Sequence, residues 1–333
     1  MRRRHQTSPV GCGLVAVLVV GAMVGTGCAS SSGNVTASVK AALAPPETTP
    51  PTTASASAPV PPCDPAQSSR FVGNMPVAGD MPAASYMRTI QARGRLIVGV
   101  DQNTLFFGYR DAETGDLDGF DIALAREVAR AIFGNPDAVE LRAVTTDQRL
   151  PVVESGDVDL VASQITATCA RRAEVDLSTI YYLAHQKVLV RTGGPITKVA
   201  DLAGRKVCAT TGSTSLDHIT HVVPGAVPYP VAARTDCLVA LEEGTVDAIT
   251  SDDTILLGFE VQDPINTEIL PQELSNEPYA LATSKHHPEF GRFVNGVLDE
   301  LRANGRLEQL YHQYLNHAGF VLPSAPPPAA YAD

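Results

Sequence analysis

The sequence lacks the features that mark several large classes of proteins. It has no Gly-x-Ser-x-Gly motif, which positions the nucleophile of many serine hydrolases, and no Cys-x-x-Cys pair of the kind that binds zinc. No segment repeats at the spacing of a solenoid. Basic residues are few, 25 against 36 acidic ones, for a formal net charge of −11, and they form no long run after the N-terminus. This charge pattern argues against nucleic-acid binding.

The N-terminus has the pattern of an export signal at residues 1–27. Arg2, Arg3 and Arg4 precede an uncharged, mostly apolar run at residues 9–27. This run is shorter than the roughly 20 apolar residues of a membrane-spanning helix, so cleavage is expected. Residues 23–28, MVGTGC, resemble a bacterial lipobox, which implies lipid attachment at Cys28 and an anchor in the cell membrane. The alternative is cleavage nearby and release. Both place the domain outside the cytoplasm.

The next segment, residues 28–85, is predicted to be a tether. Prolines stand among alanine, serine and threonine as far as about residue 82, and this composition cannot bury a core. Proline-rich chain stays extended at about 3.1 Å per residue, so it would hold a domain away from the membrane. Residues 323–333 are expected to form a similar proline-rich tail, which leaves residues 86–322 as the folded part.

Strand and helix patterns alternate through the folded part. Short β-branched runs predict strands at residues 95–101, 139–144, 158–162, 206–209, 246–250 and 278–282. Between and after them, apolar residues at helical spacing predict helices from residue 121 and at residues 148–154, 215–222, 237–243 and 289–303. This alternation indicates an α/β protein with a largely parallel sheet covered by helices.

Eight sequence blocks in family order resemble the polar amino-acid-binding proteins of ABC importers, over about residues 94–315. The blocks are GRLIVG at 94–99, GFDI at 119–122, GDVDL at 156–160, ITAT at 165–168 with Arg171, DLAGRKV at 201–207, TGSTS at 211–215, VDA at 246–248 through Asp252, and NGRL at 304–307 with Tyr311. The resemblance implies a periplasmic-binding-protein type II fold, with two α/β lobes joined by two crossing strands at 188–190 and 279–281. Lobe 1 would contain residues 86–192 and 277–322, and lobe 2 residues 193–276.

Apart from Cys12 and Cys28 of the signal region, four of the six cysteines lie in a context that permits disulfides. They are Cys63, Cys169, Cys208 and Cys237, and four cysteines allow three pairings. We favour Cys208 with Cys237, because both fall in lobe 2, which leaves Cys63 to pair with Cys169. Their role would be structural.

A zwitterionic amino acid needs a cation for its carboxylate and an anion for its ammonium, both shielded from water. Arg171 stands where the family places its arginine, and a guanidinium can hold a carboxylate by two hydrogen bonds. Backbone amides at Ser213, Thr214 and Ser215, between a strand and a helix, would bind the same carboxylate. The alternatives are a solvated Arg171 at a helix start and an ordinary N-cap at Ser213 or Thr214.

The ammonium site is predicted around Asp252, which aligns with the aspartate that the family uses. Asp253 makes this assignment ambiguous by one residue, and either carboxylate could instead cap the following helix. Thr166 and the backbone carbonyl of Gln164 would complete the ammonium shell, as the resemblance implies.

Further residues are predicted to shape the pocket. Asp101 ends the first strand and would support the site from lobe 1, while Phe106 or Phe107 would supply an apolar wall or a core residue. Arg149 stands near the position from which family members reach an acidic side chain, which favours glutamate or aspartate, followed by their amides. The alternative for Arg149 is an exposed position on its helix.

The sequence therefore predicts a monomeric, extracytoplasmic protein that binds a polar amino acid and delivers it to the permease of an ABC importer, without catalysis, cofactor or metal. One alternative is a lipoprotein sensor that signals to a membrane receptor, because both roles use the same ligand chemistry. Another is an enzyme on the same fold, such as a dehydratase. The histidine pairs, His218 with His221 and His286 with His287, are expected at the surface.

Overall fold

The computed structural model describes residues 63–316 and 325–332. The predicted signal, Cys28 and most of the predicted tether therefore lie outside the described residues. Within them, no helix is long and apolar enough to span a membrane.

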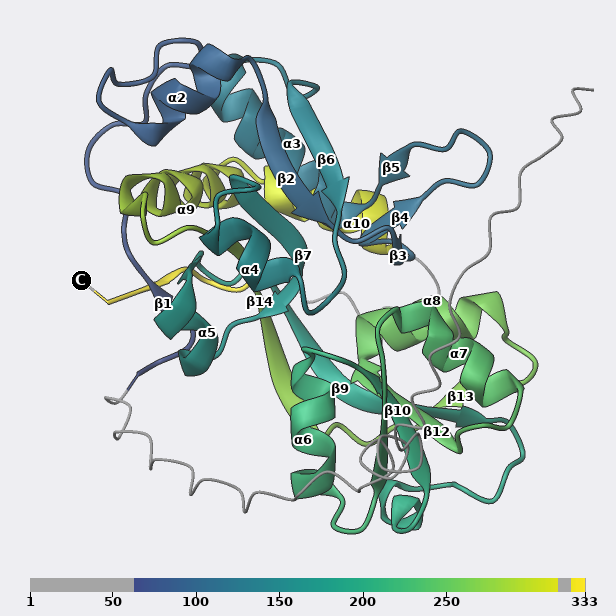
Figure 1. The fold of residues 1–333 in the computed structure, drawn as a ribbon. Helices are drawn as coiled ribbons and strands as arrows, with labels where there is room; N and C mark the ends of the chain where they lie inside the picture. Colours follow the sequence, from purple (N-terminus) through teal and green to yellow (C-terminus); the bar gives the residue numbers. More distant parts are fainter. Residues whose placement is uncertain (1–62, 317–324, 333) are drawn as a thin grey trace, which may run out of the picture. The chain divides into compact units, whose positions relative to one another are not determined.

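Lobe 1 contains a buried sheet with helices packed against it (Figure 1). Strand β2 (Leu96–Val100) runs parallel to β6 (Val139–Ala143) and to β7 (Leu160–Thr166), and β14 (Ser275–Thr283) is antiparallel to β7. Every residue of β2 and β7 is buried, as expected for strands covered on both faces. The helices of this lobe are α2 (Tyr86–Arg93), α3 (Phe120–Phe133), α4 (Arg149–Glu154), α5 (Cys169–Glu174), α9 (Pro288–Ala303) and α10 (Arg306–Leu315).

Lobe 2 is built on a second set of strands. Strand β10 (Lys206–Thr210) lies between β11 (Val227–Val231) and β12 (Ala248–Asp252), parallel to both. The lobe also contains η1 (Val199–Leu202), α6 (Thr214–Val222), α7 (Arg234–Glu242), α8 (Asp253–Gln262) and β13 (Thr267–Ile269). Helices α6 and α7 begin at the carboxyl ends of β10 and β11, which places their first turns at the sheet edge that faces lobe 1.

Two long antiparallel strands connect the lobes. Strand β9 (Tyr182–Arg191) pairs with β14 from Tyr182↔Tyr279 to Gln186↔Ser275, and then with β12 and β13 of lobe 2. The other half of β14 pairs with β7 of lobe 1. The structure therefore has the predicted two lobes and two crossing strands, but the crossing lies at 182–186 and 275–279, ahead of the expected 188–190 and 279–281.

Both ends of the folded part differ from the sequence expectation. Residues 63–85, assigned to a tether, instead pack on lobe 1: Met81 is buried, and Phe71 and Met75 pack against the core. Strand β1 (Gln67–Ser68) pairs in parallel with β15 (Ala330–Tyr331), which lies in the expected tail. The proline-rich composition concealed these scattered apolar residues.

Smaller elements complete the fold. Strands β3 (Asn103–Thr104), β4 (Gly108–Arg110) and β5 (Leu117–Asp118) form a separate three-stranded sheet, and β8 (Asp176–Leu177) pairs with β14. Both favoured disulfides are present. Cys208 bonds to Cys237 with 5.5 Å between their Cα atoms, and Cys63 bonds to Cys169 with 5.9 Å.

Candidate ligand-binding site

The two lobes enclose a small polar cavity at the carboxyl ends of their strands. In this structure it leaves about 10 Å³ for the centre of a water-sized molecule, which is about enough for one water. Its lining comes from both lobes and consists of Arg149, Gln164, Thr166, Arg171, Thr210, Ser213, Thr214, Ser215, Arg234, Ser251, Asp252 and Ile255. Seven predicted ligand residues are thus brought together, whereas Asp101, Phe106, Phe107 and Asp253 do not line this cavity.

The floor of the cavity is an irregular stretch of β7. The register between β7 and β14 shifts opposite Ala280 and Ala282, and Gln164 has a φ of +42°, rare for a residue other than glycine. Buried Asp121 holds this conformation by accepting hydrogen bonds from the backbone and side-chain nitrogens of Gln164, at 3.0 and 2.6 Å. Burial raises the pKa of Asp121 to about 6. Backbone strain of this kind is often retained at functional sites.

Arg171 connects the lobes. It follows β7 on α5, whose N-cap is Thr168, and its Nη1 donates to the carbonyl oxygen of Thr166 at 2.8 Å. Its Nη2 donates to the carbonyl oxygen of Gly212 in lobe 2 at 3.0 Å. Burial lowers the pKa of its guanidinium. Arg171 is thus partly buried and bound to both lobes, and its role toward a ligand carboxylate stays a prediction.

The start of α6 presents amide donors to the cavity. Ser213 caps the helix, because its Oγ accepts from the backbone nitrogen of Leu216 at 3.1 Å, so the capping alternative is correct for this side chain. The backbone N–H of Ser213 donates to the carbonyl oxygen of Thr210 at 3.1 Å, so its predicted role as an anion donor is wrong. Among the described residues, nothing accepts a hydrogen bond from the backbone N–H of Thr214 or Ser215, and both residues are buried and line the cavity. Free amides at a helix N-terminus attract an anion.

Glu277, which the sequence pattern did not predict as a site residue, lies beside the start of α6. Glu277 of β14 is fully buried and its Oε2 accepts from the hydroxyls of Thr166 and Thr214, each at 2.7 Å. Each of these hydroxyls uses its one hydrogen in the bond to Glu277, so toward a ligand it can only accept a hydrogen bond. Glu277 stands two residues before buried Tyr279 on the same strand face, which was the one signal available in the sequence.

The two aspartates at the start of α8, Asp252 and Asp253, have different surroundings. Asp252 is buried, lines the cavity and accepts from the Tyr279 hydroxyl at 2.7 Å. Burial, together with nearby Glu277, raises the pKa of Asp252 to about 7. Asp253 accepts from the backbone nitrogens of His185 at 3.2 Å and Thr254 at 2.8 Å. Of the two aspartates, only Asp252 lines the cavity, and its role toward an ammonium stays a prediction.

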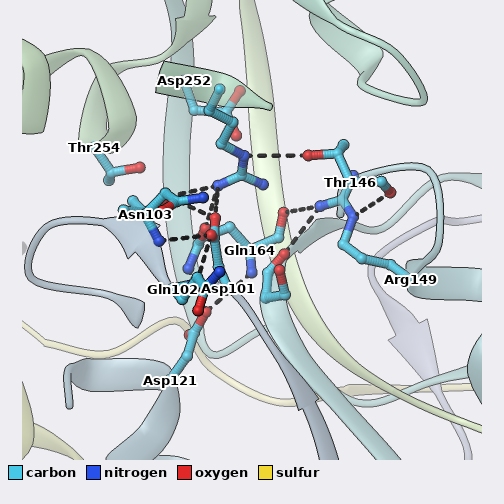
Figure 2. Close-up of polar contacts among 12 residues, drawn as sticks. Asp101, Gln102, Asn103, Asp121, Thr146, Arg149, Gln164, Asp252 and Thr254 are labelled. Atoms are coloured by element: carbon cyan, nitrogen blue, oxygen red, sulfur yellow. Dashed lines mark hydrogen bonds and ion pairs between the residues drawn. The ribbon is translucent and has the colours of Figure 1, made fainter. Parts of the chain in front are cut away.

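Arg149 is almost fully buried, so its predicted alternative as an exposed helix residue is wrong. Its Nε donates to the carbonyl oxygen of Thr146 at 2.8 Å, and its Nη1 to those of Ser163 and Gln164 at 2.9 and 3.0 Å. Figure 2 shows this arginine beside Thr146 and Gln164. Burial lowers its pKa, as do the positive charges of neighbouring arginines. The Gln164 carbonyl is thus engaged by Arg149, and its role toward an ammonium stays a prediction.

The remaining predicted residues support the site from outside the cavity. Asp101 accepts from the backbone nitrogens of Gln102 and Asn103 at 2.7 and 2.9 Å, which fixes its carboxylate (Figure 2). Phe107 is fully buried in the core of lobe 1, and Phe106 is partly buried against that core. The structure therefore supports the core role for Phe107, and the role of Phe106 as an apolar wall stays a prediction.

Arg234 is a site residue that the sequence pattern did not predict. It is the first residue of α7, is 6% exposed, and forms an ion pair with Asp101 of lobe 1, with Nη1 2.8 Å from Oδ2. The available signal was its place just after a strand of lobe 2, where open α/β sheets bind ligands. A lone arginine in the sequence Ala-Ala-Arg carries no motif that would select it.

Comparisons with known proteins agree with this fold. The sequence is 30% identical to the ABC transporter glutamine-binding protein GlnH of Bacillus subtilis (strain 168) over 69% of this chain and 84% of that protein. It is 36% identical to the glutamine-binding protein of Geobacillus stearothermophilus over 60% of this chain and 76% of that one. The crystal structure of the L-cysteine solute receptor of Neisseria gonorrhoeae superposes with a TM-score of 0.68 at 28% identity, covering 72% of this chain and 98% of that one. Residues 96–317 match one family throughout, and the chain belongs to the bacterial extracellular solute-binding proteins, family 3.

Proposed function

We propose that this protein binds a polar amino acid of the glutamate, glutamine, aspartate and asparagine class outside the cytoplasm and delivers it to the permease of an ABC importer. The observation that carries the proposal is the interlobe cavity, where Arg171, the amides at the start of α6 and Asp252 lie together. Named relatives that bind glutamine support the ligand class. We further infer that the protein catalyses no reaction and is anchored through a lipid on Cys28.

The ligand carboxylate would bind between the lobes. Arg171 of lobe 1 already reaches Gly212 of lobe 2, and the free amides of Thr214 and Ser215 come from lobe 2. A carboxylate here accepts from a guanidinium and from a helix N-terminus at once, and both interactions strengthen out of bulk water. Binding would therefore hold the lobes together, as in hinge closure around a ligand.

The ligand ammonium would bind to Asp252 and to the hydroxyl of Thr166. The carboxylate of Asp252 supplies the charge. The Thr166 hydroxyl donates its hydrogen to Glu277, so toward a ligand it can only accept a hydrogen bond. An ammonium can donate to it, whereas a carboxylate cannot. Arg171 and the α6 amides would thus attract the carboxylate, and Asp252 and the Thr166 hydroxyl the ammonium, which would fix the orientation of the α-amino acid.

A thermal-shift screen of the purified full-length protein against all standard amino acids tests this proposal, because a ligand that binds only the folded state raises the melting temperature. A rise with glutamate, glutamine, aspartate or asparagine supports it. No rise with any amino acid contradicts it.

Two neighbouring arginines provide a matched pair of variants. Arg171→Ala removes charge-assisted hydrogen bonds to the ligand and should weaken binding by at least about 100-fold. Arg172→Ala removes hydrogen bonds to the carbonyl oxygens of Pro65, Leu177 and Ser178, away from the cavity, and should lower stability but leave affinity unchanged. Equal affinities of Arg171→Ala and the wild type, by titration calorimetry, would refute the assignment.

A further inference from the structure

Arg234 reaches across the cleft from lobe 2 into a polar cluster of lobe 1. Its Nη1 donates to the Thr104 hydroxyl at 2.8 Å and to the side-chain oxygen of Gln164, beside the ion pair with Asp101. Its Nε donates to the hydroxyl of Thr146 at 3.2 Å. Every one of these partners belongs to lobe 1.

The three cavity arginines lie in the order Arg171, Arg149, Arg234. Arg149 shares Gly212 as a partner with Arg171, with Nη2 3.4 Å from the carbonyl oxygen, and contacts Thr146 and Gln164 as Arg234 does. Arg234 therefore lies at the opposite side of the site from Arg171, the proposed binding residue for the ligand carboxylate. It also lines a second interlobe cavity with Asp101, Asn103 and Thr145. A side chain that extends from the α-carbon away from Arg171 meets Arg234.

One donor of Arg234 remains available in this position. Among the described residues, none accepts a hydrogen bond from its Nη2, whereas Nε and Nη1 are engaged. A guanidinium has donors only, so the ligand atom that meets it must be an acceptor. Arg149 adds a second positive charge nearby, although its own donors are directed at backbone carbonyls.

We propose that Arg234 determines ligand specificity: its guanidinium binds a side-chain carboxylate or carboxamide oxygen of the amino acid and excludes ligands with cationic side chains. The inference rests on the proposed function and names the residue and chemistry behind its ligand class. It also assigns to Arg234 the side-chain recognition that the sequence had suggested for Arg149.

The test compares three ligands of similar length on the purified full-length protein by titration calorimetry: L-glutamate or L-glutamine, whichever binds tighter, L-norleucine and L-lysine. In the wild type, the acid or amide should bind tightest and lysine should not bind. In Arg234→Met, the affinity ratio of that acid or amide to norleucine should fall by about 10- to 150-fold, the effect of one hydrogen bond to a charged group.

Two further variants separate recognition from folding. Asp101→Asn/Arg234→Met removes both charges of the ion pair, so that no carboxylate is left buried alone, and should show the same change in ratio. Arg205→Met removes a lobe 2 arginine that is 3.7 Å from Asp247 and partly exposed, and should change no ratio. Equal losses for every ligand in both Arg234 variants would show that Arg234 only holds the lobes together, and lysine binding to the wild type would equally overturn the inference. A wild type that binds no amino acid refutes the proposed function itself.

Discussion

Asp252 should make ligand affinity depend on pH near neutrality. Burial and the charge of Glu277 raise the pKa of this cavity carboxyl to about 7 in the ligand-free protein. Only the ionised form attracts an ammonium, so the fraction of protein that can bind the ligand falls as pH falls through 7. An affinity scales with its binding-competent fraction.

The magnitude follows from that pKa. At pH 8 about nine-tenths of the Asp252 carboxyls are ionised, and at pH 6 about one-tenth, so affinity should fall roughly tenfold, or about 1.4 kcal/mol, between these values. Measurements should stay above pH 6, because burial also raises the pKa of Asp121 to about 6 and its protonation would disturb Gln164.

The assay is calorimetric titration of the tightest-binding amino acid at several values of pH from 6 to 8.5. His218 needs a control, since histidine is the side chain that ordinarily changes charge in this range and its Nδ1 lies 4.0 Å from Oε1 of Glu277. A His218→Gln variant should retain the tenfold change. Affinity that is flat from pH 6 to 8.5 in the wild type, or a dependence that vanishes in His218→Gln, would refute the role given to Asp252.

Two other substitutions have opposite expected effects on stability. Asp252→Asn should abolish binding yet raise the free energy of unfolding at pH 8 by up to roughly 4 kcal/mol, because the wild type carries a buried charge above its raised pKa of about 7 and an amide can still accept from Tyr279. This gain should shrink as pH falls toward 4, where the wild-type carboxyl is protonated, and denaturant unfolding at both pH values measures it. Replacing Cys63 and Cys169 by serine should lower the free energy of unfolding by roughly 1 kcal/mol more than replacing Cys208 and Cys237. The reason is loop length, because the first disulfide joins residues 106 apart and the second joins residues 29 apart. A larger loss for the shorter loop would contradict this estimate.

The sequence predicted the elements that local periodicity specifies. Strands β2, β6 and β10 and helices α3, α4 and α9 lie within a few residues of their expected positions, because apolar residues repeat with period 2 or 3.6 or form short buried runs. Arg171 and Asp252 could be found because each stands beside a recognisable block of sequence. Local sequence was therefore sufficient to select candidate residues that lie within or next to a short recognisable segment.

Features that depend on tertiary contacts escaped prediction. Arg234 and Glu277 are isolated charged residues, and only the folded chain shows that each is buried with partners far away in sequence, Asp101 for one and Thr166 for the other. Burial of Arg149 could not be predicted either, because its partners are backbone carbonyls of the irregular stretch of β7. Strain and burial at a functional site are where local rules are expected to fail.

The most direct test of the central claim is whether the protein recognises both charged groups of an α-amino acid. Calorimetric titration should compare the tightest-binding amino acid with its α-methyl ester and its N-acetyl derivative, which lack the carboxylate charge for Arg171 and the ammonium for Asp252. We expect the free amino acid to bind at one site per chain and either derivative to bind at least about 100-fold more weakly. A derivative that binds as tightly as the free amino acid would show that the protein does not recognise both charged groups.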